Sequence, residues 1–364
     1  MFNIFRIFKK TQKQSAGDNS SQNQLIGNEV SQTNISNQTN ILYGGLVPQD
    51  IVELTTTVST QVNKQALSLC VSVAEDVATK RLKNFEDNWI PRITSLENAR
   101  EHLEDPKYQF MIRDADVTAI KSSRNEDLQM LTELLVCHID KGNDLKVDAG
   151  IHRAIKIVHE VDNDALCALT VITALLRTIP IAGDILEGLK ALDNLYKELL
   201  YLDLPSGEAW IEHLEVLGAI RTCNGNFLKL KDILIKYMDG YVCAGIKGDT
   251  EDYQKAIDIL VQNGESSNVL VENINLPGYY RLNAVQLSEV RESQQSIVSL
   301  YNHDAALLNT VKDQFMNNWD RFVNLKIIHN WFETVPHGFN INSVGRALAQ
   351  TNAKRCYKGF PDLI

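Results

Sequence analysis

The chain has 364 residues and a mass of 41.0 kDa, which is enough for a large buried core and for two or three domains. Hydrophobic residues make up 44% of the chain and charged residues 23%, and this composition excludes disorder of the whole chain. The formal net charge of -10 disfavours non-specific binding to nucleic acid or anionic lipid, because the summed field repels phosphate.

Residues 1–14 form a short segment that combines apolar and basic side chains, which suits contact with a membrane surface. The segment lacks the length and the small-residue cleavage site of a secretory signal. A frayed terminus, or a strip that docks on a partner chain, is the alternative interpretation. The residues predicted to make a membrane contact are Phe2, Phe5, Arg6, Phe8, Lys9 and Lys10.

Residues 15–45 form a low-complexity polar arm, rich in Ser, Thr, Asn and Gln, with isolated bulky apolar residues. Such a segment buries too little surface to fold alone, but short amide-rich strands can stack between chains. Two hypotheses follow. The arm either helps to assemble a homo-oligomer or serves as a flexible linker.

Helical patterns begin after the arm. Residues 46–95 predict one long helix, with Pro91 marking its boundary with the next element. Residues 95–205 predict a helical bundle, because apolar residues recur at three- and four-residue spacings. The segment 165–176 is apolar nearly all round and is expected at the centre of the core. Two apolar stripes define helices on either side of it: Leu128, Leu131, Leu134, Leu135 and Ile139, then Ile185, Leu189, Leu192, Tyr196 and Leu199.

Residues 206–284 predict a mixed region. A helix with Trp210, Leu214 and Leu217 inward ends near Gly218, and "SNVLVENINLPGYYRLNAV" predicts a strand, a Pro-Gly turn and a strand. Together they are similar to the third helix and wing of a winged-helix domain. Residues 285–364 predict a helical region, then a short strand at 339–341 and a last helix capped by Asn342 or Ser343. This ending suggests a second wing-like unit. The predicted fold class is therefore mainly α, with a bundle, winged-helix-like elements and short β-ribbons.

Histidine and cysteine side chains supply the candidates for chemistry. A metal site could be imagined from Cys137, His138, His152 and His159, but their spacing matches no zinc pattern, so packing and surface roles are favoured. His329, Glu333 and His337 recur every four residues, but Pro336 interrupts the helix that would align them. His213 is interpreted as an exposed helix residue.

Phosphate-binding loops, dinucleotide fingerprints and the G-x-S-x-G elbow are not found in the sequence. Acidic clusters such as Glu101 with Glu104 are more typical of solvated helix faces than of acid–base pairs. The sequence therefore predicts a protein that is not an enzyme and needs no cofactor. DNA contact is also disfavoured, because the helix before the wing carries Glu208, Glu212 and Glu215.

The compartment follows from the cysteines and the apolar runs. Six cysteines are scattered without a CxxC pair, which is typical of small buried groups in a reducing compartment. None of the apolar runs approaches the roughly 20 residues of a membrane-spanning helix. We expect a cytoplasmic protein, with a peripheral contact at the inner membrane as a further hypothesis.

Residues 103–172, "LEDPKYQFMIRDADVTAIKSSRNEDLQMLTELLVCHIDKGNDLKVDAGIHRAIKIVHEVDNDALCALTVI", resemble the bacterial abortive-infection alpha family and a related uncharacterised bacterial family. The second is similar also in its polar GDNS-type arm and its "INSVGRALAQTN" ending. Val161, Asp162 and Asn163 stand where a Leu-Ser/Thr-Pro turn is commoner. The positions that carry the likeness are Asp105, Pro106, Ala115, Asn125 to Leu128, Leu134, Leu135, Asp162 to Leu166 and Leu214 to Ile220.

The resemblance implies phage defence by abortive infection, in which an infected cell stops growing before phage matures. The leading hypothesis is a non-enzymatic defence protein that forms a homo-oligomer and binds a phage or host protein. A transcriptional regulator that uses the wing-like elements is one alternative. A metal-dependent hydrolase with an unrecognised site is the other.

Overall fold

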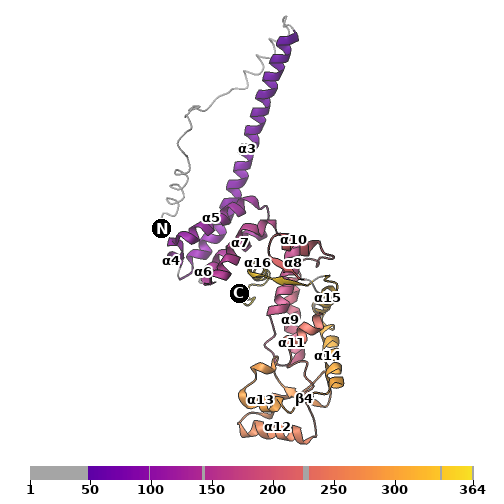
Figure 1. The fold of residues 1–364 in the computed structure, drawn as a ribbon. Coiled ribbons are helices and arrows are strands. Elements are labelled where there is room, and N and C mark those ends of the chain that lie inside the picture. The colour runs from indigo at the N-terminus through magenta and orange to yellow at the C-terminus, as the bar shows by residue number, and fades with distance from the viewer. Residues whose placement is uncertain (1–47, 98, 142–143, 224–228, 337, 363–364) are drawn as a thin grey trace. The chain divides into compact units, whose positions relative to one another are not determined.

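The computed structural model describes residues 48–97, 99–141, 144–223, 229–336 and 338–362. Contacts divide the chain into two units, Met1–Val73 and Ala74–Ile364. The described residues are mainly helical, with a few short antiparallel strands, and this confirms the fold class predicted from the sequence. Figure 1 shows the order of these elements along the chain.

The long helix α3 (Pro48–Thr94) is the first element and is continuous. Its C-terminal part belongs to the second unit, where Phe85, Trp89 and Ile93 are buried in the large core at four-residue spacing. The guanidinium of Arg81 donates a hydrogen bond to the carbonyl of Ile120 at 2.9 Å. Pro91 lies inside the helix, which ends at Thr94, and does not mark its boundary as predicted.

Six helices follow in the second unit: α4 (Ala99–Glu104), α5 (Pro106–Lys121), α6 (Asn125–Lys141), α7 (Leu145–Ile157), α8 (Asn163–Arg177) and α9 (Ile185–Leu199). Aspartates start four of them, because each side chain accepts a hydrogen bond from a backbone amide of the first turn. These N-caps are Asp105, Asp144, Asp162 and Asp184. Helix α8 is buried from Ala165 to Leu175, which confirms its predicted place in the core.

A second group of elements continues the large core. Helix α10 (Ala209–Val216) leads into β1 (Ile220–Thr222), and α11 (Leu230–Tyr237) follows. Later in the chain, α14 (Ala305–Trp319) contacts α11, and α15 (Val323–Phe332) packs against α9. Strand β1 pairs antiparallel with β5 (Phe339–Ile341), with Ile220 opposite Ile341. The sequence predicted a helix that ends near Gly218, and α10 ends at Val216; the strand β1 that follows was not predicted.

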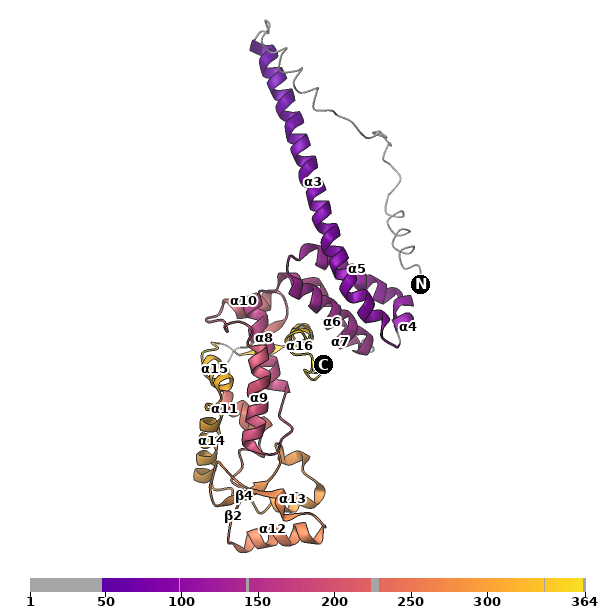
Figure 2. The same ribbon diagram turned by 180° about the vertical axis from the view of Figure 1, so that it is seen from behind.

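The C-terminal helix α16 (Ser343–Cys356) packs against α6, α7 and α8 (Figure 2). Asn342 caps it, as predicted. Polar side chains on its buried face have partners: the Asn352 amide donates to the Thr170 hydroxyl at 2.8 Å and to Tyr201 at 3.1 Å. Its oxygen accepts from Arg355 at 3.0 Å. The last helix of the chain therefore completes the bundle that began near residue 95.

A smaller core lies beside a three-stranded antiparallel sheet in the order β2-β4-β3, where β2 is Ile246–Lys247, β3 is Leu270–Glu272 and β4 is Tyr279–Leu282. Two helices cover it, α12 (Glu251–Gln262) and α13 (Glu292–Val298). Short 3-10 turns, η2 (Val158–Glu160), η3 (Ser267–Val269) and η4 (Leu287–Glu289), complete the fold. The predicted strand, turn and strand are confirmed as β3 and β4.

Arg281 connects the small core to the rest of the second unit. It is 1% exposed, and its guanidinium donates to the carbonyls of Gly183 at 2.8 Å, Leu282 at 2.9 Å and Ala284 at 3.2 Å. Gly183 lies in the loop between α8 and α9, and the guanidinium also donates to the carbonyl of Gly240 at 3.4 Å, so one buried side chain contacts three backbone segments. The Tyr241 hydroxyl donates to the Asp184 carbonyl in the same region, at 3.1 Å.

The winged-helix comparison needs a correction in its details. Helix α10 is buried in the large core, whereas the β3–β4 ribbon belongs to the small core, so the two do not form one helix-and-wing unit. The second wing-like unit, β5 followed by α16, pairs through β5 with β1. The first wing-like unit differs from this one, because its strand β4 is followed by the η4 turn and not directly by an α-helix.

Candidate interaction surface

Aliphatic side chains are exposed on α3, and the longest row of them follows one face of the helix. Val62 is 55% exposed, Leu69 66% and Val73 62%, and Ala66 between them is also exposed. Successive helical residues are rotated by about 100°, so these four positions lie within about 60° of one another. We call Val62, Ala66, Leu69 and Val73 the α3 stripe. Scattered exposed aliphatic residues are normal in proteins, but a contiguous apolar strip is typical of an interaction site.

The predicted membrane-contact residues Phe2, Phe5, Arg6, Phe8, Lys9 and Lys10 and the polar arm of residues 15–45 lie outside the described residues. Their predicted roles therefore stay predictions. Within the described residues, none of the helices is long and apolar enough to cross a membrane.

His138 occupies a buried polar centre between α6 and α7. Its ring nitrogen Nδ1 lies 2.7 Å from Oδ1 of Asp148, whose other oxygen lies 2.6 Å from the ammonium of Lys107. The ring stacks on Tyr108 with centroids 5.3 Å apart. Burial lowers the pKa of His138, and the nearby Asp148 carboxylate opposes this shift. The arrangement joins α5, α6 and α7 through one shared carboxylate.

The other two histidines of the candidate metal set, His152 and His159, each contact a different carboxylate. His152 lies 2.7 Å from Asp114, and His159 lies 3.6 Å from Glu160. Among the described residues, no three His, Cys, Asp or Glu side chains are grouped as metal ligands. The set Cys137, His138, His152 and His159 is therefore not brought together, and packing or pairing explains its histidines. Of the cysteines, Cys167 and Cys243 are buried as expected, whereas Cys70 and Cys223 are exposed.

His329 and Glu333 also have local partners. The His329 ring contacts Asp320 at 2.8 Å, which links α15 to the end of α14. The carboxylate of Glu333 accepts a hydrogen bond from the backbone amide of Leu230 at 3.2 Å, at the start of α11. His337, the third residue of that predicted series, lies outside the described residues.

Arg124 forms the most extensive polar centre in the bundle. It follows α5, and its guanidinium donates to the carbonyls of Val158 at 3.1 Å and Val161 at 2.9 Å and to the Asn163 side chain at 2.8 Å. It also pairs with Asp127 at 2.9 Å. Burial raises the pKa of Asp127, while the Ser122 hydroxyl and Arg124 oppose the rise. One cation thus joins the α5–α6 loop to the α7–α8 connection.

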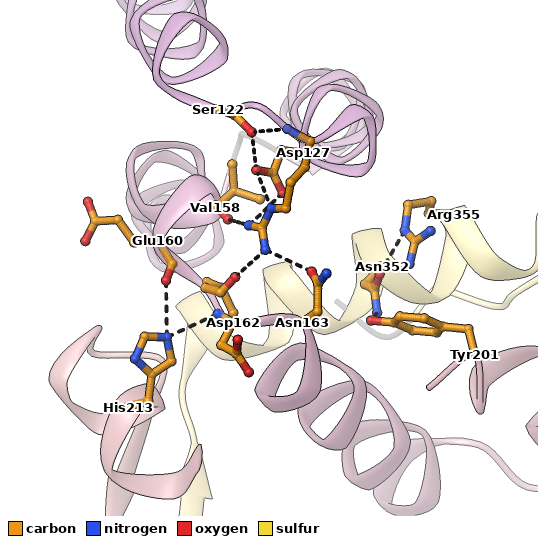
Figure 3. Close-up of polar contacts among 12 residues, drawn as sticks. Ser122, Asp127, Val158, Glu160, Asp162, Asn163, Tyr201, His213, Asn352 and Arg355 are labelled. Atoms are coloured by element: carbon orange, nitrogen blue, oxygen red, sulfur yellow. Dashed lines mark hydrogen bonds and ion pairs between the residues drawn. The ribbon is translucent and has the colours of Figure 1, made fainter. Parts of the chain in front are cut away.

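His213 of α10 contacts the same connection from the other side, as Figure 3 shows. Its Nε2 lies 3.1 Å from the Glu160 carbonyl and 3.1 Å from the backbone nitrogen of Asp162. A neutral ring nitrogen either accepts from an amide or donates to a carbonyl, so only one of these bonds forms at a time. The half-buried His213 therefore differs from the exposed helix residue that the sequence predicted.

The acidic residues of α10 have structural contacts as well. The carboxylate of Glu215 accepts from the Thr222 amide at 2.9 Å and from the Thr222 hydroxyl at 2.6 Å. These two hydrogen bonds lower the pKa of Glu215. A carboxylate held ionised on this helix repels a nucleic-acid phosphate, and the expectation that α10 does not bind DNA stays a prediction.

An open recess of about 750 Å³ lies beside the small core, between the end of α12 and the start of α13. Glu265 is in its lining and accepts a hydrogen bond from the Ser293 hydroxyl at 2.6 Å and another at 2.5 Å from the Gln294 amide. Both carboxylate oxygens are therefore used to hold α12 and α13 together.

Sequence reasoning missed the α3 stripe and the Arg124 centre. The stripe leaves a signal in the sequence, namely three- and four-residue spacing of aliphatic side chains in a helix otherwise rich in Ser and Thr. The Arg124 centre leaves almost none, because two of its four acceptor residues, Val158 and Val161, accept through backbone carbonyls more than thirty positions later in the chain.

The fold and these contacts define a mainly helical protein in which buried polar centres join the helices and an aliphatic strip of the first helix is exposed. A protein-family model matches residues 55–363, and the chain belongs to that family, whose function is unknown. No curated protein and no solved structure matches the chain.

Proposed function

We propose that this protein is a non-enzymatic bacterial phage-defence protein of the abortive-infection type, which acts through protein–protein interaction and oligomerisation. The exposed α3 stripe is the observation that supports the interaction part. The phage part rests on the resemblance of residues 103–172 to the abortive-infection alpha family.

The physical argument for an interaction is the cost of leaving the stripe in water. Each aliphatic side chain that moves from water into a contact contributes about 1.5–3 kcal/mol when fully buried. Val62, Leu69 and Val73 are each more than half exposed, so most of this free energy becomes available when a protein surface covers them. A helix face of this kind is commonly recognised by another helix.

The contacts of the buried polar centres support a binding role for the protein more than a catalytic one. Arg124, His138 and His213 all contact groups that join one helix to another. Charged groups used in this way fix the arrangement of helices. A fixed arrangement suits a body that binds a phage or host protein by its shape.

Membrane contact is a separate part of the proposal. Phe2, Phe5 and Phe8, with Arg6, Lys9 and Lys10, would place the N-terminal segment at the inner surface of the membrane. The expected result is that vesicles containing anionic lipid float the full chain and that replacing Phe5 and Phe8 with Ser reduces flotation. Unchanged flotation would remove the membrane part and leave the defence proposal standing.

Phage plating tests the function directly. The gene is expressed with its native flanking genes in a susceptible bacterial host, and plating efficiency and culture survival are measured across a phage panel. We expect reduced plating together with early collapse of the culture at high phage dose. Normal plating with every phage of the panel would contradict the proposal.

A further inference from the structure

The α3 stripe is part of a longer repeat in the sequence. Aliphatic residues recur every three or four positions from residue 51 to residue 77, in the series Ile51, Leu54, Val58, Val62, Ala66, Leu69, Val73 and Val77. At about 100° per residue, this spacing predicts one apolar side for the repeat, and the α3 stripe is its exposed central part. Such a repeat, about 40 Å long at 1.5 Å per residue, is typical of helices that pack lengthwise against other helices.

The sequence of this part of α3 forms a helix poorly by itself. Residues 55–73, "TTTVSTQVNKQALSLCVSV", contain four threonines, four valines and three serines, all of which favour helix less than alanine does. Most helical stability in proteins comes from the packing of an apolar face and not from intrinsic propensity. The helix of residues 55–73 therefore needs a partner surface to be stable, and side chains Val62, Leu69 and Val73 show where that surface binds.

Charge narrows the choice of partner. Between Glu53 and Glu75, Lys64 is the single charged residue, although the chain as a whole carries a net charge of -10. Two copies of this chain repel each other over most of their surface. Along the neutral part of α3 the repulsion is smallest, and serine, threonine, asparagine and glutamine side chains flank the stripe. A charged partner would gain little electrostatic attraction from this neutral surface. A second copy presents an equally neutral surface, so the two can meet without charge repulsion there.

We infer that the stripe is covered by the same stripe of a second copy, so that α3 is the assembly element of a homo-oligomer. This inference rests on the proposed function only for its biological purpose. It differs from the hypothesis that the polar arm drives assembly, because it assigns assembly to the aliphatic repeat of residues 51–77, which contains the α3 stripe.

Interface size sets the conditions of the test. A strip about 40 Å long and about 10 Å wide, one helix diameter, buries on the order of 800 Å² over two helices. Stable protein pairs bury about 1,200–2,000 Å². Assembly is therefore expected to depend on concentration, and the mass has to be measured over a concentration series.

The test uses the full chain and two matched double variants. One replaces Leu69 and Val73 with Gln on the stripe. The control replaces Leu67 and Val71 with Gln; these residues are 66% and 50% exposed and point about 160° away. Both variants remove similar side chains, and glutamine favours helix at least as well as valine, so neither is expected to break the helix directly.

Mass is measured by light scattering after size-exclusion chromatography. We expect a multiple of 41.0 kDa at high concentration for the native chain and the control variant. We expect 41.0 kDa at the same concentration for the stripe variant. Circular dichroism should show a loss of helix in the stripe variant on dissociation, with the thermal transition of the second unit retained.

Three results would overturn the inference. The native chain stays at the mass of one chain at every concentration, or the stripe variant assembles as the native chain does, or replacing Phe5 and Phe8 with Ser dissociates the oligomer. The last result would show that the N-terminal segment mediates assembly. Loss of assembly in the stripe variant without phage protection by the native chain would refute the proposed function and leave this inference standing.

Discussion

At the scale of single residues, Arg124 stabilises the bundle through hydrogen-bond acceptors that are mostly far from it in the sequence. Its five N–H groups reach the carbonyls of Val158 and Val161, the Asn163 side chain and the buried Asp127. A planar guanidinium suits this set of directions, whereas an ammonium has three donors on a flexible stem.

We predict that Arg124→Lys lowers the free energy of unfolding by about 2–4 kcal/mol, because carbonyls and a buried carboxylate lose donors. Urea denaturation measures it. The control is Arg100→Lys, whose exposed pair with Glu104 is worth less than about 1 kcal/mol. Equal stability of the two variants would show that Arg124 is not a joint of the bundle.

Asp116 of α5 makes the stability of the second unit depend on pH. Burial, with the nearby Glu86 carboxylate, raises its pKa from 3.8 to about 7, and its Oδ1 has no hydrogen-bond partner. The folded chain therefore holds a proton that the unfolded chain releases at lower pH. Stability from this residue is present below pH about 4 and is lost as pH rises towards 7.

We predict that Asp116→Asn raises the free energy of unfolding by about 1–3 kcal/mol at pH 8, because the amide removes a buried charge that lacks a partner, and changes it little near pH 4, where the carboxyl is neutral. Urea midpoints at both pH values measure the difference. Asp140→Asn, at an exposed position of α6, serves as the control. An equal effect of Asp116→Asn at the two pH values would contradict the assignment.

At the scale of elements, the β5–α16 unit locks the C-terminal end of the chain into the large core. Gly345 in the first turn of α16 is needed for this, because a Cβ atom there would lie 2.2 Å from the carbonyl oxygen of Ala219. Ala219 directly precedes β1, so the backbone of the two-stranded sheet would have to move.

We predict that Gly345→Ala destabilises the protein by roughly 2 kcal/mol or more, since overpacking against backbone costs about 1–3 kcal/mol. The sign of the change in stability is informative, because the same Gly-to-Ala substitution at an open helix position stabilises the helix by about 1 kcal/mol. Thermal unfolding followed by circular dichroism measures it. A variant as stable as the native chain would show that α16 is not docked tightly against β1.

The spacing of apolar residues predicted those helices that are buried either on all sides or along one face. The all-round apolar segment of α8 and the single stripe of Ile185, Leu189, Leu192, Tyr196 and Leu199 on α9 are confirmed by burial. These patterns are visible in a sequence because a helix repeats its contacts every three or four residues.

Pairings between distant segments were not predictable in the same way. Strand β1 was not predicted, because three residues carry little pattern and its partner β5 is more than a hundred positions later. The burial of Arg281 could not be predicted either, because its acceptors include carbonyls of Gly183 and Gly240, in two other loops. Sequence patterns report on burial, but they do not show which backbone groups a side chain will reach.

At the scale of the whole molecule, the two units of the chain differ in which apolar side chains they bury and which they expose. The second unit has a large core and a small core joined by buried side chains such as Arg281. The first unit presents the α3 stripe on a helix of residues that favour other structures in isolation. We therefore expect assembly and helix stability to be coupled in α3.

Phage protection by α3 variants tests the central claim most directly, namely that this is a defence protein whose action needs assembly through the stripe. Plating efficiency is measured for the native gene, for the variant with Leu69 and Val73 replaced by Gln, and for the control with Leu67 and Val71 replaced by Gln, at matched protein levels. The account predicts protection by the native gene and the control and its loss in the stripe variant. Equal protection by all three, or by none, would contradict it.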